Sequence, residues 1–217
     1  MNSLALSDDA VVLGFDPGGG RSFGAAVLSR SEFAATTVGC VRDALAWAIE
    51  RCGDQVPVAA GIDALLHWSD ESGGWRPADR ALRTAYPRVR SSVVSPNGLF
   101  GSMTVGGMAL AFRLRERWPD LVLNETHPKV LHSALTGQRD RPEQAQSATD
   151  WFVDLARLTG DPLQNAHELD AVISAWATQT GLMQGWPDLV GNNEHLVFPL
   201  GKVRFLWPEA LVEPRPG

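Results

Sequence analysis

The sequence has only two cysteines in 217 residues, and their positions argue against a disulfide. Cys40 and Cys52 fall on or beside one expected helix, where a rise of 1.5 Å per residue separates them by roughly 18 Å. A disulfide needs Cα atoms within about 7 Å, so an internal bridge is disfavoured. The same separation argues against a zinc site shared by the two thiols. A chain without an internal disulfide is typical of a reducing compartment.

Long apolar runs are also missing. No stretch approaches the roughly 20 apolar residues that a helix needs to cross a bilayer. The first ten residues, MNSLALSDDA, lack the basic start and the apolar stretch of a secretory signal peptide. Together with the cysteine usage, these features predict a cytoplasmic protein with no membrane partner.

Basic charge is not in excess. The 19 Lys and Arg residues stand against 25 Asp and Glu residues, which gives a formal net charge of −6 at pH 7. This is not the balance of a protein that coats nucleic acid nonspecifically. It remains compatible with an enzyme that holds metal ions with carboxylates and contacts phosphates through a local basic patch.

The chain shows no internal repeat and no low-complexity segment. Its length suits one domain with a sizeable core. We therefore expect a single domain over residues 1–217, with a C-terminal hairpin or tail from about residue 184.

Hydrophobic patterns predict the order of helices and strands. Apolar segments at residues 11–16, 23–29 and 32–38, with short connections, predict an antiparallel meander. A helix near residues 41–51 and a buried strand at 58–63 follow, and this fourth strand should run parallel to the first. Further expected elements are helices near 77–86, 108–118, 129–135, 142–158 and 166–183, strands at 91–95 and 121–125, and a terminal hairpin in HLVFPLGKVRFLW. The pattern predicts an α/β fold with a central mixed five-stranded sheet and helices on both faces.

Three of the apolar strands end in an acid. Asp16 ends GFD, Asp63 ends GID, and Glu125 ends LNE. Ligands of open α/β sheets bind at the carboxyl ends of the parallel strands, so neighbouring strands would bring these acids together. Close carboxylates repel one another or take up protons, and bound Mg²⁺ or Mn²⁺ would relieve that conflict. The alternative is that each acid only caps the helix that follows it.

The segment AHELDAVISAWAT predicts a helix that is apolar or small on nearly every face, which is typical of a buried helix. His167 and Asp170 are one turn apart and share a face with Ser174. A partly buried aspartate costs free energy unless it is paired or binds a metal, so we expect Asp170 to face the strand-end acids. His167 is either a catalytic group or a capping or hydrogen-bonded histidine near the helix start.

The order of the expected elements and the placement of Asp16, Asp63 and Asp170 resemble the ribonuclease H-like superfamily. The spacing of His167 and Asp170 is similar to the branch that contains Holliday-junction resolvases. Over residues 11–183, four motifs look like those of domain-of-unknown-function family 429, whose members are described as predicted ribonuclease H-like nucleases. These motifs are GFDPGGGRSFGAAVL, GIDALL, NETHP and HELDAVISAWAT.

This resemblance implies a ribonuclease H-like, Mg²⁺- or Mn²⁺-dependent nuclease that hydrolyses the phosphodiester bonds of nucleic acid. It implies Asp16, Asp63 and Asp170 as metal ligands, Glu125 as a further ligand, and His167 as a further catalytic residue. The substrate is DNA or RNA, and a homodimer is compatible with the sequence.

A basic stripe on a nearby helix offers a place for nucleic acid. Arg76, Arg80 and Arg83 recur at spacings of four and three residues, on one helical face shortly after Asp63. Such a stripe is able to hold phosphates near the metal ions. The alternative is an ordinary solvated helix face.

Two other functions fit parts of the pattern. Actin- and sugar-kinase-like ATP-binding proteins share the strand order and place glycines after an acid in their first hairpin. They usually need a second such domain, and the glycines at 18–20 lack the Lys-Ser/Thr of a P-loop. The second alternative is a noncatalytic nucleic-acid-binding module, which need not respond to Mg²⁺ or Mn²⁺.

Overall fold

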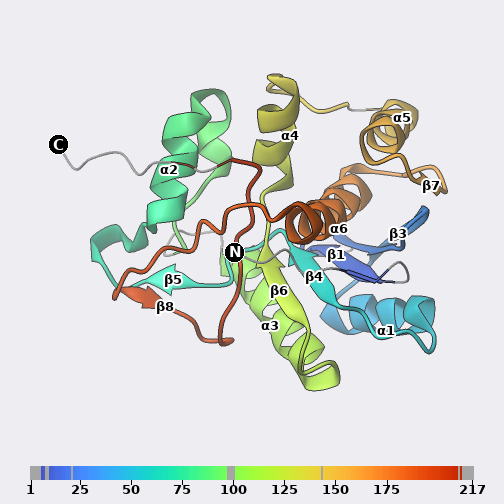
Figure 1. The fold of residues 1–217 in the computed structure, drawn as a ribbon, viewed down its shortest axis with the longest axis horizontal. Coiled ribbons are helices and arrows are strands. Elements are labelled where there is room, and N and C mark those ends of the chain that lie inside the picture. The colour runs from blue at the N-terminus through green and yellow to red at the C-terminus, as the bar shows by residue number, and fades with distance from the viewer. Residues whose placement is uncertain are drawn as a thin grey trace.

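A mixed sheet of six strands crosses the middle of the protein in the order β6-β4-β1-β2-β3-β7 (Figure 1). The structure is a computed structural model that describes residues 6–7, 10–20, 22–96, 101–142, 144–209 and 211. The α/β class and the mixed sheet that the sequence predicts are confirmed. The strands are β1 (Val12–Asp16), β2 (Phe23–Leu28), β3 (Glu32–Val38), β4 (Ala59–Ile62), β6 (Val122–Glu125) and β7 (Thr159–Gly160).

The expected number of five strands is wrong, because β7 adds a sixth at the edge. Its two residues pair in parallel with β3, Thr159 opposite Glu32 and Gly160 opposite Phe33. A strand of two residues has no hydrophobic alternation for a sequence pattern to detect. It covers backbone groups at one end of β3, which would otherwise be an open sheet edge.

The strand directions place three carboxyl ends at one edge of the sheet. β1, β2 and β3 form the predicted antiparallel meander. β4 runs parallel to β1, as predicted, with Ile62 opposite Phe15. β6 runs parallel to β4, with Glu125 opposite Ile62. The ends of β1, β4 and β6 therefore lie side by side.

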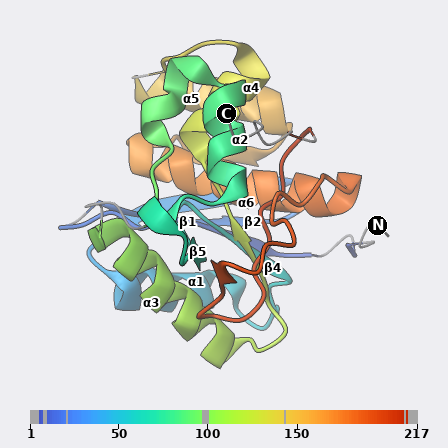
Figure 2. The ribbon, with the colours of Figure 1, turned by 90° about the vertical axis from the view of Figure 1, so that its left-hand side faces the viewer.

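Helices cover both faces of the sheet, as predicted (Figure 2). α1 (Val41–Cys52) and α3 (Gly101–Arg117) lie on one face. α6 (Ala166–Gln184) packs directly on the other face, across β1, β2 and β4. The remaining helices on that side are α2 (Pro77–Ala85), α4 (Pro128–Thr136) and α5 (Ala145–Ala156). No helix in these ranges combines the length and the apolarity that crossing a membrane requires.

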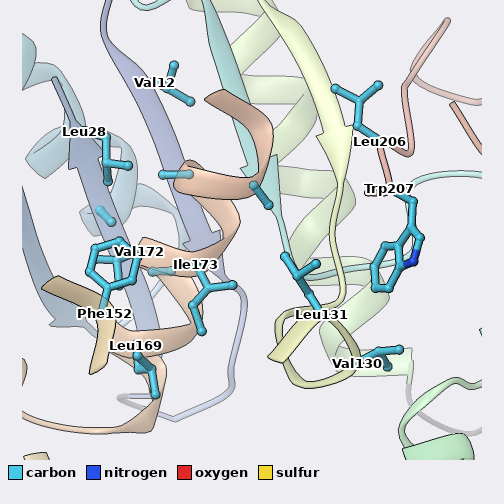
Figure 3. Close-up of a cluster of buried hydrophobic side chains, with 14 of the residues drawn as sticks. Val12, Leu28, Val130, Leu131, Phe152, Leu169, Val172, Ile173, Leu206 and Trp207 are labelled. Atoms are coloured by element: carbon cyan, nitrogen blue, oxygen red, sulfur yellow. The ribbon is translucent and has the colours of Figure 1, made fainter. Parts of the chain in front are cut away.

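Each face of the sheet has its own apolar core, because side chains of a strand alternate between the two faces. On the α6 face, Val12 and Leu28 of the sheet contribute to the same cluster as Phe152 and Ile173 from the helices (Figure 3). On the other face, Leu13 and its neighbours pack with residues of α1 and α3. This double burial explains why β1 is buried at all five positions.

Two short elements depart from the predicted pattern. The strand expected at residues 91–95 is wrong, since a 3-10 helix, η2 (Pro87–Ser92), covers its start. Pro87 fixes a φ angle that suits a helical turn and donates no backbone hydrogen bond. A second 3-10 helix, η1 (Ser72–Gly74), precedes α2.

The C-terminal segment pairs with distant parts of the chain. β8 (Leu196–Val197) pairs antiparallel with β5 (Trp68–Ser69) in a separate two-stranded sheet. Further along, Arg204 accepts a hydrogen bond from the backbone of Glu125 and donates one to Leu123, both at 2.8 Å. These bonds cover the outer edge of β6, which otherwise would expose unpaired backbone groups. The expected pairing of HLVFPLGKVRFLW with itself is therefore replaced by pairing with β5 and β6.

Candidate functional site

Asp16 and Asp63 stand at the ends of neighbouring parallel strands. Asp16 is the last residue of β1, and Asp63 follows β4 directly. The backbone N–H of Asp63 donates to the carbonyl of Phe15 at 2.9 Å, which extends the pairing of the two strands by one residue. Asp16 is 5% exposed and Asp63 is partly exposed. The sheet thus brings these two predicted acids together.

α6 approaches the same end of the sheet because glycines lie beneath it. A Cβ atom added to Gly24 would lie 2.1 Å from the carbonyl oxygen of His167, and one added to Gly14 would lie 2.0 Å from that of Ala171. Real Cβ atoms do not come this close to backbone oxygen. Both positions therefore require glycine if the α6 backbone is to lie this close to the sheet. The close packing places His167 and Asp170 beside the strand ends.

His167 contacts Asp16 directly. Its Nδ1 atom lies 2.6 Å from Oδ2 of Asp16, and its side chain is 40% exposed. Burial raises the pKa of Asp16, while the hydrogen bond and charge of His167 and the charge of Arg141 oppose that rise. His167 is not the helix cap, since Asn165 caps α6 by accepting from the N–H groups of His167 and Glu168. The other alternative, a hydrogen-bonded histidine near the helix start, agrees with its contact with Asp16.

The Asp63 carboxylate has few direct interactions. It makes no direct hydrogen bond or ion pair with any residue that the structure describes, apart from its backbone. Burial raises its pKa to about 7, with Asp16 and Glu125 adding to the rise and His127 and Arg141 opposing it. A carboxyl group with this pKa is partly protonated near neutrality. It is therefore available to a cation.

Asp170 lies within the same group and already has a cationic partner. Its Oδ1 atom is paired with Nη1 of Arg141, and both side chains are mostly buried. The charge of Arg141 also acts on Asp16 and on Asp63. One guanidinium group therefore interacts with all three predicted metal ligands.

Glu125 belongs to a separate, fully buried network. Its Oε1 and Oε2 atoms accept from Arg76 at 2.6 and 2.8 Å, and Oε2 also accepts from the backbone N–H of Leu66 at 2.9 Å. Nδ1 of His67 lies 3.2 Å from Oε2. Burial alone would raise the pKa of Glu125, but Arg76, His127 and His67 hold it well below its usual range. These contacts occupy both oxygens and leave Glu125 poorly suited to the expected role of metal ligand.

One group of three residues in the described part of the chain has the spacing of a metal site. Donor atoms of Asp79, Glu125 and His127 all lie within 4.8 Å of one another. The two carboxylates, however, are bound to Arg76, which contacts Asp79 at 2.6 and 2.9 Å. A cation there would have to displace a fully buried guanidinium group from its two partners. The donor atoms of Asp16, Asp63 and Asp170 do not all lie within 4.8 Å of one another.

The expected basic stripe is not a continuous phosphate-binding surface. Arg76 is fully buried, so its predicted contact with nucleic acid is wrong. Arg83 donates to the carbonyls of Arg90 and Val93 at 2.7 and 2.8 Å and lies over the Trp75 ring. Arg80 forms an ion pair with Glu71. Intramolecular partners therefore engage all three arginines.

Comparisons with known proteins give little guidance. No family model matches the chain, and no curated protein matches it. A solved structure of RuvC from Thermus thermophilus is similar over 81% of this chain and 96% of its own, at 15% identity and a TM-score of 0.40. A likeness at this level establishes neither a shared family nor a shared activity.

No sequence pattern indicated two of the residues that lie at or near the candidate site. Arg141 lies in the connection between α4 and α5, in the segment GQRDRPEQ, where a neighbouring arginine looks equivalent. His127 follows Glu125 by two residues within the NETHP motif, and in the structure its side chain is buried. Asp79 is different, because proline at the first helical position and an acid two residues later indicate a capped helix start.

Proposed function

We propose that the protein is a divalent-metal-dependent nuclease whose metal ligands are Asp16, Asp63 and Asp170. The observation that carries this proposal is that Arg141 pairs with Asp170, while its charge also acts on Asp16 and Asp63 at the carboxyl ends of β1 and β4. Three acids that need a shared cation are poorly explained by helix capping. Asp170 is not an isolated buried acid, since it is paired with Arg141.

The residues present fit Mg²⁺ or Mn²⁺. The three donors are carboxylate oxygens, which these hard cations prefer. The Asp63 carboxylate has a raised pKa and no direct partner among the described residues, as expected of a ligand group without its ion.

The side chains then have separate tasks. β1 and β4 hold Asp16 and Asp63 rigidly, and α6 supplies Asp170 from the opposite side. His167 fixes the orientation of the Asp16 carboxylate through its 2.6 Å contact. Bound metal ions would supply an activated water and stabilise the leaving oxygen of a phosphodiester. Gly19 is exposed, with no atom near its missing Cβ, so the turn after Asp16 leaves room for a phosphate.

Membership of the ribonuclease H-like superfamily, and of domain-of-unknown-function family 429 within it, is part of this proposal. It is supported by the order of elements on which the resemblance rests. Three antiparallel strands, a helix and a fourth strand parallel to the first are all present. The substrate is accordingly nucleic acid, with DNA and RNA both open.

The experiment pairs a nuclease assay with thermal unfolding. Wild type, Asp16→Asn and Asp170→Asn are assayed on single- and double-stranded DNA and RNA, with and without Mn²⁺. We expect Mn²⁺-dependent cleavage by the wild type alone, and a Mn²⁺-induced rise in the unfolding midpoint that both variants lose. Asp54→Asn is the matched control, because Asp54 is exposed and precedes β4 at its opposite end.

Two results would reject the proposal. Full cleavage by both variants would remove the assigned ligands from the chemistry. An equal rise in midpoint for wild type, both variants and Asp54→Asn would show that Mn²⁺ binds elsewhere. If the second result is joined by nucleic-acid binding without cleavage, the noncatalytic module is favoured instead.

A further inference from the structure

Arg141 is a cation in the position where the proposed function needs a metal. It is paired with Asp170 and interacts with Asp16 and Asp63, and its side chain is 18% exposed. Burial lowers its pKa, and the charges of Asp63 and Asp16 oppose that change. A guanidinium group keeps its charge under ordinary conditions, so it neutralises the acids as a metal ion would.

Arg141 also reaches a neighbouring cavity. A cavity of about 190 Å³ is lined by Arg141, Lys129, Asp140 and Asn165, among others. Its volume is far above the 10–15 Å³ that one water needs, so it has room for a larger polar group. Lys129 is exposed and adds a second positive charge. Arg141 is thus common to the acid group and to a cavity with two cationic side chains.

The electrostatics of the acid group decide what happens when a metal binds. A divalent ion next to Asp170 would repel a guanidinium group held at the same carboxylate, because like charges that are close together repel strongly in a partly buried site. The ion and Arg141 therefore cannot both contact Asp170 at the present positions. The cavity that Arg141 lines gives the guanidinium group space away from Asp170, and Lys129 lines the same cavity.

We propose that Arg141 exchanges with the divalent cation, balancing the carboxylates of the metal-free protein and contacting a substrate phosphate once the metal is bound. This inference rests on the proposed function and adds to it a residue outside the predicted ligand set. Guanidinium groups bind phosphate oxygens in a bidentate manner, which suits the second role. Lys129 lines the same cavity and adds a second positive charge for the phosphate.

The first test measures Mn²⁺ affinity by isothermal titration calorimetry, without substrate. Arg141→Gln should bind Mn²⁺ about tenfold more tightly than wild type or better, because a competing and repelling charge is removed. Its metal-free unfolding midpoint should fall, since Asp170 loses its partner. Arg139→Gln is the matched control, because Arg139 lies two residues away and its side chain is 70% exposed. It should change neither quantity.

The second test measures cleavage at saturating Mn²⁺. Arg141→Gln should raise the KM for nucleic acid or lower kcat by about tenfold or more, in spite of its tighter metal binding. Arg141→Lys keeps the charge and guards against loss of folding. It should retain a Mn²⁺ affinity close to that of wild type while cleaving more slowly, because an ammonium group does not form the bidentate contact.

The possible outcomes distinguish failure of the Arg141 exchange from failure of the proposed nuclease function. Wild type that binds Mn²⁺, with an unchanged or weaker affinity in Arg141→Gln, overturns the exchange and leaves the nuclease intact. Tighter Mn²⁺ binding with unimpaired cleavage overturns the phosphate contact. Absence of Mn²⁺ binding in wild type and in Arg141→Gln rejects the metal site, and the exchange falls with it.

Discussion

The Oδ2 atom of Asp16 lies 2.6 Å from Nδ1 of His167, although the two residues are 151 positions apart in the chain. The contact joins the end of β1 to the first turn of α6. It depends on Gly24, which lets the helix backbone at His167 come down onto the sheet. The position of a carboxylate is therefore set by a glycine on one strand and a histidine on a distant helix.

Replacing His167 by alanine should weaken metal binding while sparing the fold. A hydrogen-bond partner of a ligating carboxylate typically accounts for about 10- to 100-fold in metal affinity or activity. Folding should be little affected, because Asn165 rather than His167 caps α6. Mn²⁺ titration and the unfolding midpoint check both points.

The matched control is His195→Ala. His195 also pairs with an aspartate, Asp70, at 2.9 Å, but on the exposed surface. Its loss should leave Mn²⁺ affinity unchanged. Equal affinities for wild type, His167→Ala and His195→Ala would show that the Asp16 contact plays no part in metal binding.

Glu125→Gln should damage stability far more than metal binding. Glu125 and Arg76 form a buried ion pair at 2.6 Å, and removing one partner of such a pair costs about 3–5 kcal/mol. Glu116→Gln is the control, since its pair with Arg113 is exposed and should change stability by less than about 1 kcal/mol. Chemical denaturation measures the difference. A stable Glu125→Gln protein that no longer binds Mn²⁺ would restore Glu125 as a ligand.

Much of the fold could be predicted because its signals are local. The meander, the parallel fourth strand and the helices at both faces follow from apolar segments separated by glycine or polar turns. β7 and β8 could not be predicted, since a two-residue strand is defined by its partner rather than by its own pattern. The same is true of Arg204, which pairs with the edge of β6.

Some residues of the candidate site could likewise be predicted from local patterns, and others could not. The positions of Asp16 and Asp63 at neighbouring strand ends were predictable, because each acid follows an apolar segment. Arg76 was predicted to lie on a helix surface because of its spacing from Arg80 and Arg83. In the structure it precedes α2, and its side chain is buried among acids. Arg141 lies on a connection whose course is set by the packing of α4 and α5. A local sequence pattern does not indicate which of several arginines in polar segments will be buried in the folded protein.

Gly14→Ala should strain the contact between the sheet and α6. The added Cβ would meet the carbonyl oxygen of Ala171 at 2.0 Å and the Cβ atom of Ala175 at 2.7 Å, so the helix must shift. Overpacking of this kind costs about 1–3 kcal/mol. The shift should also lower Mn²⁺ affinity, because α6 carries Asp170. Gly19→Ala is the control, since no atom lies within 4 Å of its added Cβ. Equal stability of the two variants would contradict the close packing.

The stability of the metal-free protein should depend on pH through Asp63. Its folded-state pKa is raised to about 7 by burial and by Asp16, whereas an unfolded aspartate has a pKa of about 3.9. The folded state therefore favours the protonated form. The resulting stabilisation is fully present below about pH 4 and is lost as pH rises through about 7. Since Asp63 is partly exposed and water screens part of the effect, the loss should be on the order of 2 kcal/mol.

Asp63→Asn isolates this contribution, because asparagine is neutral at every pH. Without metal, the variant should match wild type near pH 4 and be more stable than wild type at pH 8. Mn²⁺ should reverse the order at pH 8, since it stabilises only the protein that keeps the ligand. Unfolding midpoints across this pH range, with Asp54→Asn as the exposed control, measure the effect. A constant difference between Asp63→Asn and wild type from pH 4 to pH 8 would mean that Asp63 titrates as an ordinary surface acid.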